Sequence, residues 1–99
     1  MDNKNMLSDE QLENVNGGMY ESRDIITRVI SIISEQLDID RNMIQPHSVL
    51  NMDLGADFYD VIDIIQALEL SFDVRLDEGL ISVSSTVEDI VHLIEIAAR

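Results

Sequence analysis

Apolar residues recur at the spacing of an α-helix in three stretches of this chain, and this pattern limits the possible folds most strongly. An α-helix turns by about 100° per residue, so apolar residues three and four positions apart share one face. No stretch alternates with the two-residue period of a strand. The hydrophobic fraction is 45% but the aromatic fraction is only 4%. A core made of Ile, Leu and Val favours an all-α bundle over a β-sandwich.

The expected bundle has three main helices and one short helix. The first main helix runs from about residue 23 to residue 37, with Ser22 as its N-cap. The short helix spans about residues 77–82. The faces predicted to be buried in the three main helices are, in chain order, Ile26, Val29, Ile30, Ile33 and Leu37; Val61, Ile64, Ile65, Leu68 and Phe72; and Val87, Ile90, Val91 and Ile94.

Capping signals mark the starts of the second and last main helices. Asp57 and Asp60 have the spacing of a capping box, and Thr86 and Asp89 repeat it. Between the first and second helices lies a long connection, residues 38–57, and connections of this length usually carry packing anchors or function. The anchors predicted here are Ile44, Leu50 and Leu54.

The net charge of −14, from 20 acidic and 6 basic residues, excludes several functions. Nucleic acids and anionic membranes would be repelled, and no apolar run of about 18 residues is present to make an integral membrane protein. A basic protein surface is the natural partner. The alternative is that the charge only keeps a small protein in solution.

Catalytic and metal-binding residues are not apparent. The chain has no cysteine, which removes thiolate chemistry and disulfides. His47 and His92 lie far apart with no motif joining them, so each is expected at the surface and no metal site is predicted. No nucleophile with a base and an orienting group is visible, so we do not expect an enzyme.

Residues 53–60 read Asp-Leu-Gly-Ala-Asp-Phe-Tyr-Asp and resemble the prosthetic-group motif of acyl carrier proteins, Asp-Leu-Gly-Ala-Asp-Ser-Leu-Asp. Residues 35–40 resemble the end of that family's first helix. Residues 67–69 and 72–74 resemble the end of its second helix, and residues 85–91 the start of its last. The resemblance covers about residues 22–97 and implies an acyl-carrier-protein-like four-helix bundle with a long loop between its first and second helices.

Members of that family carry 4′-phosphopantetheine on the serine that opens the second helix, and Phe58 stands at that position here. A phenyl ring has no nucleophilic atom, and the phenol of Tyr59 points about 100° further round the helix. We therefore expect no attachment residue and no 4′-phosphopantetheine on this protein.

The resemblance also implies partner docking through the second helix. The residues expected there are Phe58, Tyr59, Asp60, Ile62 and Asp63. Phe58 either joins an exposed apolar patch or folds over the long loop, and the second arrangement is slightly favoured because isolated exposed apolar residues are common. The acids either meet basic partner residues or serve the helix N-terminus, and capping is favoured for Asp57 and Asp60.

Residues 6–18 read Met-Leu-Ser-Asp-Glu-Gln-Leu-Glu-Asn-Val-Asn-Gly-Gly and resemble the double-glycine leaders of bacteriocins. A peptidase-containing ABC transporter cuts such leaders after the second glycine. Here Leu7, Leu12 and Val15 would form the recognised apolar ridge, and Gly17 and Gly18 would enter the narrow cleft of its cysteine peptidase. The alternative is a flexible tail with an accidental Gly-Gly pair.

These resemblances predict a leader, residues 1–18, and an acyl-carrier-like domain, residues 19–99. The leading interpretation is a non-catalytic precursor, made in the bacterial cytoplasm and exported after cleavage at Gly18. The alternative is an intracellular carrier-like scaffold that docks biosynthetic enzymes through its second helix. Non-covalent binding of a lipid within the bundle is allowed but not indicated.

Overall fold

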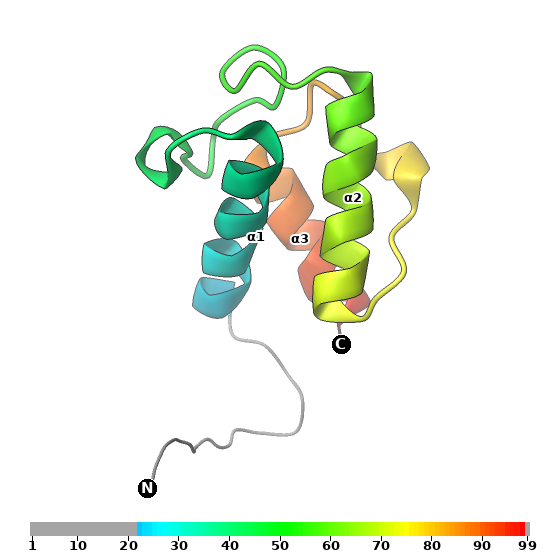
Figure 1. The fold of residues 1–99 in the computed structure, drawn as a ribbon. Helices are drawn as coiled ribbons and strands as arrows, with labels where there is room; N and C mark the ends of the chain where they lie inside the picture. Colours follow the sequence, from blue (N-terminus) through cyan, green and yellow to red (C-terminus); the bar gives the residue numbers. More distant parts are fainter. Residues whose placement is uncertain (1–21, 99) are drawn as a thin grey trace, which may run out of the picture.

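A computed structural model of the protein describes residues 22–98, which form three α-helices joined by two loops (Figure 1). Helix α1 spans Ser22–Leu37, α2 spans Phe58–Phe72 and α3 spans Val87–Ala97. Each loop contains one turn of 3-10 helix, η1 at Arg41–Met43 and η2 at Glu78–Leu80. No strand occurs within these described residues, which confirms the predicted all-α class.

The buried faces of α2 and α3 are those that the apolar spacing predicts. The residues buried on them are Val61, Ile64, Ile65, Leu68 and Phe72 on α2, and Val87, Ile90, Val91 and Ile94 on α3. Helix α1 packs against both of these helices. The three helices therefore enclose one aliphatic core, and its many branched side chains hold the helices in fixed positions.

The stripe that helix α1 buries agrees with the predicted one at Val29 and Ile33 but includes Ile25, which was not predicted, and leaves Leu37 only half-buried. Its core residues are Ile25, Val29 and Ile33, whereas Ile26 and Ile30 are half-buried at the edge of the face. The helix carries isoleucine or valine at six of its 16 positions and touches two neighbours. Its apolar face is therefore broad, and the sequence leaves the centre of that face ambiguous. The predicted N-cap, Ser22, is instead the first residue of the helix.

The long loop between α1 and α2 is fixed to the chain segment that precedes α3. The backbone N–H of Leu50 donates to Ser85 O at 3.0 Å, and that of Asn51 donates to Val83 O at 2.9 Å. In the opposite direction, the N–H of Val87 donates to Ser48 O at 3.0 Å. The predicted anchors are confirmed, since Ile44, Leu50 and Leu54 are all buried. Hydrogen bonds and anchors together give this loop a defined shape.

The predicted short fourth helix over residues 77–82 is not an α-helix. The segment contains only the 3-10 turn η2, which is capped by the Asp77 carboxylate accepting from the N–H of Gly79 at 2.9 Å. None of the three η2 residues is buried, and a turn without a buried face has little to stabilise further helical residues. Ile81, just after the turn, supplies the buried contact instead.

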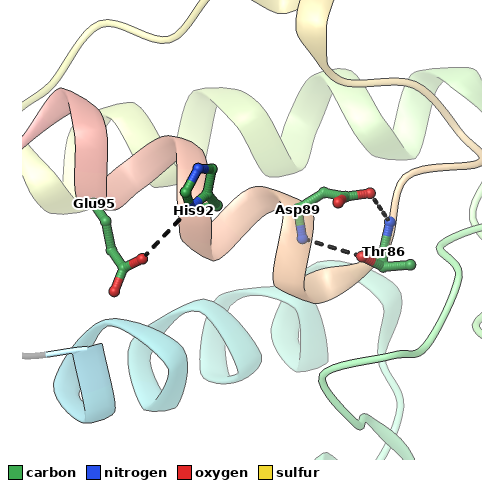
Figure 2. Close-up of polar contacts among 4 residues, drawn as sticks. All are labelled: Thr86, Asp89, His92 and Glu95. Atoms are coloured by element: carbon green, nitrogen blue, oxygen red, sulfur yellow. Dashed lines mark hydrogen bonds and ion pairs between the residues drawn. The ribbon is translucent and has the colours of Figure 1, made fainter.

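Helix α3 begins with the capping box that the sequence predicts (Figure 2). The N–H of Asp89 donates to Thr86 Oγ1 at 3.1 Å, and the N–H of Thr86 donates to an Asp89 carboxylate oxygen at 3.0 Å. These two bonds satisfy backbone donors that a helix start leaves without intrahelical partners. The start of α3 is therefore fixed at the point where the long loop is attached.

At the other end of the bundle, Arg28 of α1 holds the end of α2. Its guanidinium donates to the Ser71 carbonyl oxygen at 3.0 Å and lies over the Phe72 ring, 5.1 Å from the ring centroid. A guanidinium placed there donates to a carbonyl oxygen in the last turn of α2, which has no partner within the helix. Its positive charge also interacts favourably with the negative end of the helix dipole. The C-terminal end of α2 is thus tied to α1.

Leu68 and Leu70 of α2 allow a direct test of this core. Leu68 is fully buried and Leu70 is 84% exposed. We expect Leu68→Ala to lower the free energy of unfolding by about 2–5 kcal/mol through lost burial and a residual cavity, and Leu70→Ala to change it by no more than about 0.5 kcal/mol. Urea denaturation followed by circular dichroism measures both values. Similar losses for the two variants would contradict the packing described here.

Candidate functional site

The first turn of α2 is held by a capping box of two carboxylates. The N–H of Asp60 donates to Asp57 Oδ1 and the N–H of Asp57 donates to Asp60 Oδ2, both at 2.9 Å. The capping role that the sequence favours for these two acids is therefore present in the structure. Their negative charge also lies near the positive end of the helix dipole, which adds to the stability of this turn.

The chain reaches this turn through a tight loop. Gly55 has a φ of +75°, a conformation that a side chain would strain. The Asp53 carboxylate accepts the N–H of Val49 at 2.7 Å, and the N–H of Ala56 donates to Leu50 O at 2.9 Å. This local arrangement fixes the direction in which the backbone enters α2, and with it the direction of the first side chains of the helix.

Those first side chains are two aromatic rings that face solvent. Phe58 is 64% exposed and Tyr59 is 74% exposed. Their ring centroids lie 5.8 Å apart with an interplanar angle of 72°, an edge-to-face arrangement. The slightly favoured prediction that Phe58 folds away over the long loop is wrong, because the turn directs its ring outward. The rings form an exposed aromatic pair.

Beside the aromatic pair lies a hollow between α2 and the segment around η2. It has a volume of about 470 Å³. Its lining residues are Phe58, Val61, Ile62, Ile65, Glu78, Gly79, Ile81, Ser82 and Val83. The docking residues predicted from the sequence include Phe58 and Ile62 of the α2 wall but no residue of the opposite wall. The signal for that wall was weak, since Ile81 and Val83 stand alone in an irregular segment that shows no helical or strand period.

The remaining predicted site residues occupy different places. Ile62 is half-buried and lines the hollow, Asp60 is half-exposed at the cap, and Asp63 is exposed one turn further along α2. The structure thus brings five of the predicted docking residues to one end of α2. The predicted leader residues Leu7, Leu12, Val15, Gly17 and Gly18 lie outside the described residues.

Within residues 22–98, no group of three or more side chains is placed to bind a metal ion. His47 and His92 are both exposed, as the sequence predicts. His92 Nδ1 lies 3.9 Å from a Glu95 carboxylate oxygen on the same helix (Figure 2). No helix of this part of the chain combines the length and apolar character that crossing a membrane requires.

Two comparisons identify the class of protein that this fold and loop define. A family model described as a phosphopantetheine attachment site matches residues 27–94. The chain therefore belongs to the family of phosphopantetheine attachment domains. It is also 39% identical over 77 residues to the acyl carrier protein of Thermotoga maritima, an alignment that covers 78% of this chain and 95% of the relative. Within the family it is an acyl-carrier-protein-like domain.

These matches overturn one prediction. The sequence predicted a protein without 4′-phosphopantetheine, whereas the matched family and the acyl carrier protein relative both point to a phosphopantetheine-carrying protein. The error came from treating one residue, Phe58, as decisive for the whole domain. The family model matches residues 27–94, far more of the chain than this one position, and neither comparison identifies the residue that would hold the group.

The first turn of α2 does not fit attachment of this group through a serine. Phe58 offers a phenyl ring, and the hydroxyl nearest in sequence is the exposed phenol of Tyr59. Esterification requires an oxygen nucleophile at the position that the transferase reaches. The structure of this turn accounts for an exposed aromatic surface and gives no serine hydroxyl on which a phosphodiester could form.

Proposed function

We propose that this acyl-carrier-like domain is a non-catalytic docking protein that presents the start of α2 to a partner protein. The observation that carries the proposal is the exposed pair Phe58 and Tyr59 beside the apolar hollow. Buried aromatic anchors supply most of the affinity in many protein interfaces. Two aromatic rings that are mainly in solvent in the free domain can gain that energy when a partner covers them.

The charges near the aromatic pair specify the partner further. Asp57, Asp60 and Asp63 lie within or beside the first turns of α2, and Glu78 lines the hollow. All four are acidic, in a chain of net charge −14. A partner with an apolar socket and a rim of Lys and Arg matches this surface, because complementary charges speed the encounter and exclude acidic competitors. Enzymes of a biosynthetic pathway are the partner class that the scaffold interpretation proposes.

Substitution of Tyr59 tests the docking proposal. We expect Tyr59→Gln to weaken binding of the partner isolated from native cells by about tenfold or more, because an aromatic anchor is lost. Met43→Gln is a matched control. Met43 is 68% exposed and belongs to η1, which lies on the side of α1 that is away from α2 (Figure 1). Titration calorimetry measures both affinities. Equal losses for the two variants, or no loss for either, would count against docking at this site.

We propose that Phe58 stands where the acyl carrier motif has its serine, which gives a second test of the same surface. We expect Phe58→Ser to accept phosphopantetheine from coenzyme A in the presence of a phosphopantetheinyl transferase, with a mass gain of about 340 Da. The serine oxygen would form the phosphodiester as the phosphoanhydride of coenzyme A breaks. Intact-mass spectrometry measures the gain, and the native chain measured alongside shows whether another residue carries the group. An unmodified F58S would mean that the transferase cannot dock on this turn.

A second proposal concerns where the protein acts. Residues 6–18 have the apolar spacing and terminal Gly-Gly of a transporter leader and directly precede the domain. We infer that a peptidase-containing ABC transporter cuts the chain after Gly18 and exports the remainder. Three considerations support this. In a short helix, Leu7, Leu12 and Val15 would lie near one side, and two glycines would allow entry into a narrow cleft. Only three residues would separate the cut from the start of α1 at Ser22.

Coexpression with a matching transporter tests the export proposal. We expect a released product whose sequence begins at Met19, identified by mass spectrometry. Leu12→Gln should reduce its yield several-fold, because the ridge loses an apolar contact. Asn5→Gln, which lies outside the ridge, should leave the yield unchanged. Release of a chain that still contains residues 1–18, or normal cleavage of the Leu12 variant, would rule this proposal out.

A further inference from the structure

The surface between α1 and η1 differs in charge from the chain as a whole. A hollow of about 480 Å³ lies there, lined by Asp24, Thr27, Arg28, Ser31 and Arg41. Residues 22–98 contain only four arginines and no lysine, and two of these arginines line this one hollow. Because only one acid lines it with them, the hollow has a net positive charge in a chain of net charge −14.

The side chains of the hollow can bind a carboxylate. Arg41 is exposed on η1, and the structure records no ion pair for it within residues 22–98. Ser31, half-buried on α1, adds a hydroxyl group that can donate. Arg28 holds the end of α2 and adds positive charge to the same hollow. Guanidinium groups form charge-assisted hydrogen bonds with carboxylates, so the ligand that fits here is an acidic segment.

The part of the chain that precedes α1 has the required charge and sufficient length. Residues 1–18 contain four acids and one lysine, and three of the acids lie within residues 9–13. Glu13 precedes Ser22 by nine residues, which can span up to about 30 Å. Ser31, the farthest α1 residue of the hollow, lies about 13.5 Å from Ser22 along the helix axis. The acidic residues can therefore reach the hollow without full extension of the chain.

We propose that residues 9–13 bind across this hollow in the same molecule, with their carboxylates on Arg28 and Arg41. The short connection keeps the segment near the hollow at an effective concentration on the order of millimolar, so a weak contact suffices. Exposed ion pairs are weak and are screened by salt, so the contact opens readily. The consequence, which rests on the export proposal, is that the folded domain makes residues 6–18 less accessible to the peptidase.

Paramagnetic relaxation in the full-length chain tests the binding of this segment. The chain has no cysteine, so Gln11→Cys gives a single site for a nitroxide label. We expect the label to broaden the amide signals of Ser31 and Arg41. The signal of Gly79 should not change, because η2 lies on the far side of α2 from α1 (Figure 1). Raising the NaCl concentration from about 0.05 M to about 0.5 M should reduce the broadening several-fold.

Two arginine variants that change the net charge equally make the test specific. Arg41→Gln should reduce the broadening at Ser31 about threefold or more, because the hollow loses a guanidinium. Arg75→Gln, in the loop after α2, should leave it unchanged. Equal broadening in the native chain and both variants would overturn the proposal, and so would uniform broadening across the domain. Broadening that comes only from a second, spin-labelled chain would place the contact between molecules and also overturn it.

Cleavage measurements separate this inference from the export proposal. With the peptidase of a matching transporter, we expect the R41Q chain to be cut after Gly18 several-fold faster than the native chain. The R75Q chain should be cut at the native rate. Equal rates for all three would overturn the effect on cleavage and leave the binding that relaxation measures. Failure of every chain to be cut would contradict export, whereas the binding is measured without a transporter.

Discussion

The attachment of the long loop to the segment before α3 is the constraint on which the rest of the domain depends. Residues 48–51 exchange backbone hydrogen bonds with residues 83–87, two segments that are far apart in the sequence. Each buried backbone group paired in this way avoids the cost of an unsatisfied donor or acceptor. The loop then has one shape, and this shape places Gly55 and Asp57 so that α2 starts at a fixed point.

The surface that we propose for docking follows from that fixed start. Once the capping box sets the rotation of α2, Val61, Ile64 and Leu68 must face the core, and the helical period leaves the opposite side to solvent. The exposed aromatic pair and Leu70 are therefore consequences of the same geometry that buries the core. A rigid helix tied at both ends presents its side chains with little loss of conformational entropy on binding, which favours its use as a docking element.

Much of the fold could be read from the sequence because its strongest signals are local. The capping boxes need only residues three positions apart, and the cores of α2 and α3 follow a clean helical period. The buried face of α1 was harder to predict, because Ile25 and Ile26 are equally apolar. Only the contacts of α1 with α2 and α3 decide that Ile25 is the residue in the core. The wall of the hollow around Ile81 depends on tertiary contacts, which no local pattern records. The outward direction of Phe58 likewise depends on how the loop is held.

The long-range pairing of the loop also bears on biosynthesis. Because residues 48–51 find their backbone partners only in residues 83–87, a growing chain lacks those partners until synthesis has passed that point. The surface at the start of α2 is then completed late, although its own residues are made much earlier. A partner that binds this surface, as we propose, would therefore find it complete only in chains that contain residues 83–87.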